Sequence, residues 1–147
     1  MSVGDSVTWI SGNALVAPGP GIEGRGVIAQ APIRKGQWFD CAPALVIPES
    51  DLAPHAVLNC YVYFWMFNPK TRYAVAFGNG SLYNHHPRNN AEFKLDYENS
   101  CVCYRAVRDI EPGEEIFINY DYDDEDLVGH PELDWYRDFM ARETAKA

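Results

Sequence analysis

Short apolar runs separated by glycine, proline and small polar residues make up most of this chain. Runs of about four to eight apolar and aromatic residues between such breaks are typical of β-strands. The pattern predicts strands at residues 27–31, 37–47, 61–67, 72–77, 91–97 and 100–107. An interruption is expected within the second of these, near Pro43. The chain is therefore predicted to be mostly β.

Helical patterns are confined to two segments. Residues 48–59 favour a short irregular helix, because acidic residues and a serine precede their apolar positions. A second helix is predicted to begin at Pro131, with Glu132 and Asp134 in its first turn, where the helix dipole favours acidic residues. Its apolar stripe consists of Leu133, Tyr136 and Met140. These features predict a C-terminal helical segment at about 131–143.

Length and composition describe a small globular protein. The 147 residues fit a single domain, 1–147, and 47% of them are hydrophobic, which is enough for a core. No apolar run approaches the ~20 residues that a membrane helix needs. The N-terminus lacks a basic segment followed by an apolar one, so no signal peptide is expected. The protein is accordingly predicted to be intracellular, in the cytoplasm or in the nucleus.

The formal net charge of −9 bears on the choice of partner. Nucleic-acid binding needs basic patches that release counterions from the phosphates, so nucleic acid is a poor partner for this chain. Neither is a membrane expected. A basic peptide or protein fits the charge better, although net acidity also serves a small protein simply by keeping it soluble.

The four cysteines, Cys41, Cys60, Cys101 and Cys103, include no Cys-x-x-Cys pair. Cys101 and Cys103 lie in a predicted strand, where alternate side chains share a face. We expect buried thiols at these positions, and no metal site is predicted.

Two later stretches carry residues that point to a site. Residues 83–90 read Tyr-Asn-His-His-Pro-Arg-Asn-Asn, a polar run that cannot supply a core. Residues 113–122 read Gly-Glu-Glu-Ile-Phe-Ile-Asn-Tyr-Asp-Tyr, an apolar strand that delivers two tyrosines to one end. A Gly-Arg-Gly sequence at residues 24–26 precedes both.

Together the three stretches resemble the SET-domain family of protein lysine methyltransferases. The family's central motif, Asn-His-Ser-Cys-x-Pro-Asn, is matched in register by Asn84, His85 and Asn90. Three positions depart from it: His86, Pro87 and Asn89. The family's last motif, Gly-Glu-Glu-hydrophobic followed by x-x-x-Tyr, is met by residues 113–120 without a gap. Gly-x-Gly near the N-terminus is uninformative alone, but the order and spacing of all three motifs make the resemblance specific.

The resemblance implies a SET core over about residues 22–122. Its fold would be several small curved sheets, a knot-like threading of the C-terminal segment and a short C-terminal helix. The implied cofactor is S-adenosyl-L-methionine, and the residues expected to bind it are Gly24, Arg25, Gly26, Asn84, His85 and Tyr120. The two glycines lack Cβ atoms, so the backbone can approach the cofactor closely there. The chain has none of the zinc-binding cysteine clusters that flank many SET domains, so no metal is implied.

Tyr120 is the catalytic residue that the resemblance implies, with its hydroxyl beside the transferring methyl group. Tyr122, two residues on, would share its face if the chain stays extended, and would line the channel for the substrate lysine. Tyr61 is expected to line the same channel, with Tyr63 as the competing choice. Aromatic faces attract a cationic lysine, while an apolar channel disfavours its ammonium form.

Ile118 is also assigned to the lysine channel by the resemblance. It stands two residues before Tyr120, where many SET enzymes carry a phenylalanine or tyrosine that sets how many methyl groups are added. Isoleucine has no hydroxyl to hold a water in the space of a further methyl group. The sequence therefore predicts that two or three methyl groups are added.

Three alternatives stay open at this point. Trp135 or Tyr136 could stack on the adenine of the cofactor, or could simply pack the final helix against the core. The protein could also be a catalytically inactive SET-fold module that binds a peptide at a sheet edge, although a tyrosine kept at position 120 favours the enzyme. The expected partner is a histone tail or another basic protein, and a homodimer remains open.

Overall fold

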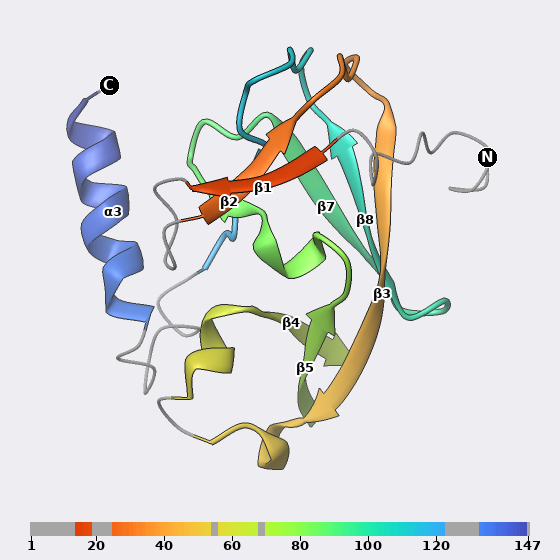
Figure 1. The fold of residues 1–147 in the computed structure, drawn as a ribbon. Coiled ribbons are helices and arrows are strands. Elements are labelled where there is room, and N and C mark those ends of the chain that lie inside the picture. Colours follow the sequence, from red (N-terminus) through yellow and green to blue (C-terminus); the bar gives the residue numbers. More distant parts are fainter. Residues whose placement is uncertain (1–13, 19–24, 54–55, 68–69, 123–132, 147) are drawn as a thin grey trace.

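This computed structural model describes residues 14–18, 25–53, 56–67, 70–122 and 133–146. Their regular structure consists of three β-sheets, one α-helix and three short 3-10 helices (Figure 1). The largest sheet has the strand order β4-β5-β3-β8-β7, with antiparallel neighbours throughout. Its strands are β3 (Trp38–Pro48), β4 (Val62–Phe67), β5 (Lys70–Ala76), β7 (Ala91–Asp96) and β8 (Cys101–Ala106). The prediction of a mostly β chain is confirmed.

The long strand β3 connects the two halves of this sheet. Up to Pro43 it pairs with β8, and from Ala44 onward it pairs with β5. The expected interruption near Pro43 is wrong, because β3 continues through that residue. Pro43 lies where the strand changes partner, and its carbonyl accepts a hydrogen bond from the Phe77 N–H at 2.9 Å. A proline without an N–H is tolerated at such a switch because no regular ladder needs one there.

Two small sheets complete the fold. Strands β1 (Ala14–Pro18) and β2 (Arg25–Ala29) form an antiparallel pair. Strands β6 (Asn84–His85) and β9 (Phe117–Ile118) pair in parallel, with Asn84 opposite Phe117 and His85 opposite Ile118. This parallel pair places the two late motifs side by side, as the resemblance implied.

The helical elements are short except at the C-terminus. Three 3-10 turns, η1 (Glu49–Asp51), η2 (Val57–Cys60) and η3 (Gly80–Leu82), link strands. The final helix α3 (Asp134–Ala145) confirms the predicted C-terminal helix, although its predicted start at Pro131 lies outside the described residues. Within the described part of the chain, no helix has the length and apolar character to cross a membrane.

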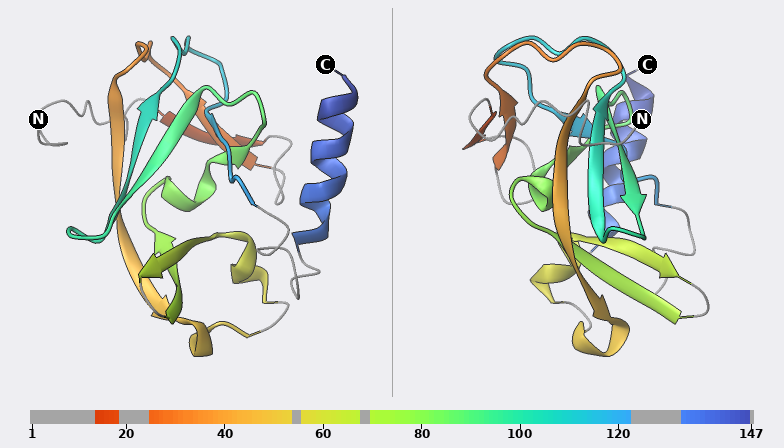
Figure 2. Two further views of the ribbon diagram at one scale, coloured as in Figure 1. Left: turned by 180° about the vertical axis from the view of Figure 1, so that it is seen from behind. Right: turned by 90° about the vertical axis from the view of Figure 1, so that its right-hand side faces the viewer.

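The core is formed mainly between the large sheet and the segments that lie over it. Fully buried side chains include Val27, Phe39, Tyr83, Tyr104 and Ile116. Helix α3 lies on the side of the molecule away from β3, in both Figure 1 and the left view of Figure 2. Its buried Tyr136, together with Leu133, packs with Tyr120 and Tyr122 in a smaller second cluster. The two tyrosines of the last motif are therefore held under the helix.

Candidate active site

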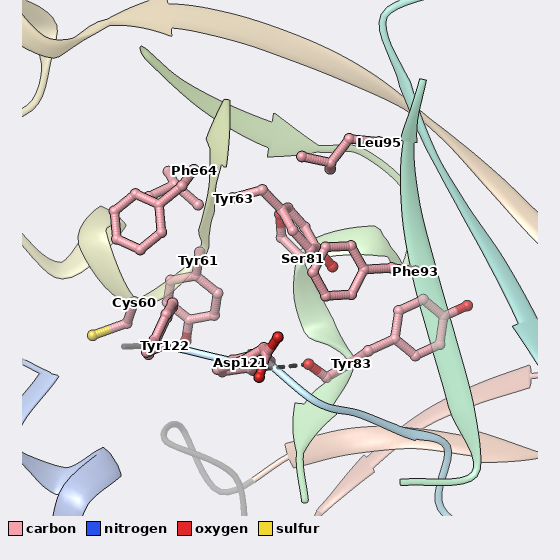
Figure 3. A pocket seen from close by; sticks show the side chains of 12 residues that line it. Cys60, Tyr61, Tyr63, Phe64, Ser81, Tyr83, Phe93, Leu95, Asp121 and Tyr122 are labelled. Atoms are coloured by element: carbon pink, nitrogen blue, oxygen red, sulfur yellow. Dashed lines mark hydrogen bonds between the residues drawn. The ribbon is translucent and has the colours of Figure 1, made fainter. Parts of the chain in front are cut away.

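Two pockets meet at one side chain, Tyr120. The first, which we call the tyrosine pocket, has a volume of about 310 Å³ (Figure 3). Its aromatic wall consists of Tyr61, Tyr63, Phe64, Tyr83, Phe93, Tyr120 and Tyr122. The second, which we call the helix pocket, has a volume of about 590 Å³. Its lining is Asn84, His85, His86, Phe117, Tyr120, Trp135, Phe139, Arg142, Glu143 and Lys146.

Tyr120 is fixed at both its backbone and its hydroxyl. The Tyr120 N–H donates to Nδ1 of His85 at 2.9 Å, and the hydroxyl donates to the Tyr83 carbonyl oxygen at 2.8 Å. Burial raises the pKa of the Tyr120 hydroxyl above its ordinary value, so the group stays neutral. Because its proton is used in the bond to Tyr83, the lone pairs of its oxygen are left as acceptors.

His85 holds the backbone of Tyr120 in place through its ring nitrogen Nδ1. Since Nδ1 accepts the Tyr120 N–H, the neutral ring carries its proton on Nε2, which lies 3.0 Å from the sulfur of Met140 on α3. The ring also packs against Tyr136 at 4.7 Å and Phe139 at 5.7 Å between centroids. Burial, with a smaller contribution from His86, lowers the pKa of His85 to about 4. The imidazole is therefore neutral at physiological pH.

Acidification should consequently weaken the fold through His85. The folded-state pKa of about 4 lies below the ordinary value of 6.5, so between these values the unfolded chain binds the proton more tightly. Stability from this group is complete above about pH 6.5 and is lost as the pH falls toward 4, by on the order of 3 kcal/mol.

Urea denaturation across this pH range measures the effect, with His85→Asn as the matched variant that cannot titrate. The wild type should show the steeper decline, after both curves are referred to their own values at pH 7. Parallel curves for the two proteins would show that His85 is not the titrating group.

Hydrogen bonds from the side-chain amides of Asn84 and Asn90 hold the two late motifs together. Buried Asn90 donates from Nδ2 to the Glu115 carbonyl at 2.8 Å, and its Oδ1 accepts the Phe117 N–H at 2.8 Å. Asn84 donates from Nδ2 to Oε2 of Glu115 at 2.9 Å. A Cβ on Gly26 would lie 2.6 Å from that carboxylate and 2.8 Å from Asn84 Nδ2. A glycine at 26 is thus needed for the Asn84–Glu115 contact, which holds Asn84 at the wall of the helix pocket.

The structure separates the two competing channel tyrosines. The Tyr63 hydroxyl donates to the Gly80 carbonyl at 2.7 Å and lies 2.8 Å from the Tyr104 hydroxyl. Although Tyr63 lines the tyrosine pocket, its polar end is held in the core. Tyr61 lines the same pocket from the end of η2, immediately before β4. Tyr61 is therefore the better candidate for a polar contact with a substrate.

The sequence-predicted channel residues do not all come together. Tyr61, Tyr120 and Tyr122 share the tyrosine pocket. Ile118 lines neither pocket, because its side chain is completely buried in the core. Strand β9 ends at Ile118, before Tyr120, and Asp121, which lies between Tyr120 and Tyr122, has a positive φ of 55°. The regular alternation of an extended strand is therefore not maintained from Ile118 to Tyr122.

Only some of the predicted cofactor residues line a pocket. Asn84, His85 and Tyr120 line the helix pocket. Gly26 lines neither pocket. Its lack of a Cβ leaves room for the contact between Asn84 and Glu115. Gly24 and the side chain of Arg25 lie outside the described residues.

One face of α3 supplies pocket residues that the sequence reasoning missed. Phe139, Arg142 and Lys146 line the helix pocket, with spacings of three and four that place them on one side of a helix. Trp135 continues this face four residues earlier. The same spacing could have been recognised in the sequence beside the buried stripe of Leu133 and Tyr136. The helix thus has one face for the core and an adjacent face for the pocket.

Trp135 and Tyr136 have different surroundings. Tyr136 is buried, and its ring packs on His85 and on Tyr122 at 4.7 and 5.0 Å. Trp135 is half-buried at the wall of the helix pocket. Its Nε1 is buried and has no hydrogen-bond partner among the described residues. A buried donor without a partner is costly, so this N–H is suited to a ligand acceptor in the pocket.

Comparisons with known proteins agree with this geometry. A sequence model of the SET domain matches residues 24–121. A curated relative from Schizosaccharomyces pombe, a histone-lysine N-methyltransferase specific for lysine 37 of histone H3, is 33% identical over 101 residues, which are 67% of this chain and 67% of the relative. A crystal structure from Plasmodium falciparum, described as a candidate histone methyltransferase, superimposes with a TM-score of 0.62 at 22% identity, covering 77% of this chain and 96% of that one. The last comparison concerns the fold alone.

Proposed function

The chain belongs to the SET-domain family, and on that premise we propose that it is an S-adenosylmethionine-dependent protein lysine N-methyltransferase. The observation that carries this proposal is the meeting of two pockets at Tyr120. Transfer of a methyl group is an in-line displacement, so donor and acceptor must approach each other from opposite sides. Two pockets that share a single wall residue supply such an arrangement.

We assign the cofactor to the helix pocket. S-adenosylmethionine would supply the methyl group as an electrophilic methyl sulfonium. The residues present fit such a ligand, since Trp135 and Phe139 offer aromatic faces and the unpartnered Trp135 Nε1–H offers a donor. Arg142 offers a cation for a carboxylate, whereas Lys146 is already paired with Glu143 at 2.7 Å. Asn84 would bind through polar groups at the opposite wall, and His85, whose ring nitrogens contact Tyr120 and Met140, would hold that wall in place.

The tyrosine pocket would receive the substrate lysine. Its aromatic wall attracts the cationic side chain and excludes water, which disfavours the ammonium, whose ordinary pKa is ~10.4. The raised pKa of Tyr120 makes a tyrosinate base unsuitable, so the proton leaves lysine for water before transfer. The acceptor lone pairs of the Tyr120 hydroxyl then orient the neutral amine. Positioning provides the catalysis here, and no residue needs to form a covalent intermediate.

A basic protein substrate fits the surroundings of this pocket. Asp121 lines it and is exposed, and the chain carries a formal net charge of −9. Charge of this sign favours the approach of a lysine-rich segment. The S. pombe relative acts on histone H3, and we propose a histone tail or a similar basic segment as the substrate class. A histone substrate would place the enzyme in the nucleus of a eukaryotic cell.

Incubation with methyl-labelled S-adenosylmethionine, core histones and a cell lysate tests this function. We expect label in one histone or a small set of basic proteins, and calorimetry should show cofactor binding without any added metal. Folded protein that binds no cofactor at millimolar concentration would contradict the proposal. That result would leave a SET-fold module that binds peptides without catalysis.

The number of methyl groups is a further part of the proposal, and we expect two or three. The position two residues before Tyr120 brings no hydroxyl to the tyrosine pocket, because isoleucine has none and Ile118 is buried in the core. A tyrosine is larger than the space that Ile118 fills, so Ile118→Tyr is expected to push a hydroxyl toward the wall of the tyrosine pocket and shift products toward monomethylation, at a cost of ~1–3 kcal/mol in stability from overpacking.

Mass spectrometry of a methylated peptide over time gives the product distribution. The melting temperature and the cofactor affinity of Ile118→Tyr serve as controls for its fold. A wild type that stops at one methyl group under excess cofactor would show that another residue closes the pocket.

A further inference from the structure

Three of the four cysteines converge on one face of the large sheet. Cys41 of β3 lies directly opposite Cys103 of β8 in the register, and Cys101 lies two residues before Cys103 on the same strand. The Sγ atoms of all three lie within 4.8 Å of one another. The distance is 3.4 Å between Cys41 and Cys101 and 3.7 Å between Cys101 and Cys103. We call this group the thiol triad.

We propose that the thiol triad is a binding site for a thiophilic metal ion, with Zn²⁺ as the expected occupant. Thiolate sulfur is the ligand that zinc and other soft d¹⁰ ions prefer in proteins. The sequence alone placed only Cys101 and Cys103 on a common face, and no metal was predicted. The strand register adds Cys41 as the third ligand, and it is this addition that makes a site.

The sulfur triangle has the dimensions of a metal site. Zinc–sulfur bonds of ~2.3 Å at tetrahedral angles separate the sulfur atoms by about 3.8 Å. Two edges of the thiol triad, 3.4 and 3.7 Å, need to change by only a few tenths of an ångström. Rigid neighbouring strands hold the three Cβ atoms, so the ligands are largely preorganised. A water would complete four-coordination at the open side.

The solvent exposure of the thiols and the charges around them also suit a bound metal ion. Cys41 and Cys101 are half-buried, which leaves a path from solvent, whereas Cys103 is 1% exposed. Binding releases the thiol protons, so three thiolates and one Zn²⁺ give a site with a net charge of −1. Two charged residues of β7 lie on the same face: Lys94 is opposite Cys103 in the register, and Asp96, opposite Cys101, forms a hydrogen bond with that thiol. Burial raises the pKa of the Cys101 thiol to about 11, so the ion must displace a proton there.

The site would be separate from methyl transfer. Successive residues of a strand point to opposite faces, so Cys103 lies on the other face of β8 from Tyr104. Tyr104 is on the core side, where its hydroxyl reaches Gly80 and Tyr63. A metal in the thiol triad would therefore link β3 to β8, the two strands seen side by side in Figure 1, without entering the tyrosine pocket. This inference does not depend on the proposed function.

Titration of the full chain with Cd²⁺ and then with Zn²⁺, in the presence of a phosphine reductant, tests the proposal. We expect one ion per chain, an ultraviolet thiolate-to-cadmium charge-transfer band, and its loss when a chelator is added. Zinc should raise the melting temperature by several degrees, because an ion that binds only the folded state stabilises it.

Variants locate the bound ion. Cys101→Ser should weaken binding by about 10²-fold or more, and its half-buried position favours retention of the fold. Cys103→Ser tests the buried ligand, and circular dichroism reports whether that variant folds. Cys60→Ser is the matched control, since it removes the one thiol outside the triad and should leave the affinity unchanged. Absence of the charge-transfer band in the wild type, or equal affinities for wild type and Cys101→Ser, would overturn the proposal.

Discussion

Tyr120→Phe should lower the rate of methyl transfer by ~10²-fold or more, since it removes one positioned polar group at the reacting centre. The ring remains, so the packing with Tyr122 and Trp135 is retained. The hydroxyl that donates to the Tyr83 carbonyl at 2.8 Å is lost, and with it the acceptor that orients the lysine amine. Affinity for S-adenosylmethionine should stay close to that of the wild type, because the helix pocket keeps its aromatic wall.

Single-turnover kinetics with a histone substrate, together with calorimetry of the cofactor, separate these two effects. Tyr97→Phe is a matched control, because it makes the same chemical change at an exposed residue that lines neither pocket. A Tyr120→Phe enzyme as fast as the wild type would show that another tyrosine orients the lysine. A loss of cofactor affinity with a normal maximal rate would also contradict the assigned role.

Gly80→Ala should cost about 3 kcal/mol or more in the free energy of unfolding, which is a large fraction of the stability of a small domain. A Cβ at this position would lie 2.5 Å from the Cβ of Ala76 and 2.7 Å from that of Ala42. These atoms belong to or adjoin paired strands and cannot move aside cheaply. The Gly80 carbonyl also accepts hydrogen bonds from Tyr63 and Tyr104, at 2.7 and 2.9 Å. Displacing it would therefore disturb the wall of the tyrosine pocket as well.

Gly78→Ala provides the comparison. A Cβ there meets no atom within 4 Å, but Gly78 has a φ of +63°, so the expected cost is on the order of 1 kcal/mol from backbone strain alone. Urea denaturation of both variants measures the difference between crowding and strain. If both variants lost the same free energy of unfolding, crowding around Gly80 would not be the cause of the loss.

Local patterns in the sequence were sufficient for most strands and for the central site residues. Alternation and turn residues predicted the β7–β8 hairpin, and the resemblance to the SET motifs proposed Asn84, His85 and Tyr120, which the structure brings to one pocket. These predictions depend on residues near one another in the chain. The parallel pairing of β6 with β9 has no local signature, because each strand is only two residues long.

The features that the sequence did not show depend on contacts between residues that are far apart in the chain. The resemblance assigned Ile118 to the lysine channel, whereas its side chain is buried in the core and lines neither pocket. Pro43 was read as a break, whereas a change of pairing partner accommodates it. The thiol triad needs the register between β3 and β8, which the sequence does not specify. Side chains that meet across strands could not be foreseen without it.

We propose that Tyr120 separates a cofactor pocket from a lysine pocket. A crystal structure of the protein with S-adenosylhomocysteine and a peptide containing the target lysine would decide whether it does. We expect the adenosyl group beside Trp135 in the helix pocket and the lysine side chain between Tyr61 and Tyr122. The amine nitrogen should lie within hydrogen-bond distance of the Tyr120 hydroxyl, in line with the cofactor sulfur. Cofactor in the tyrosine pocket, or a lysine nitrogen out of reach of Tyr120, would contradict it.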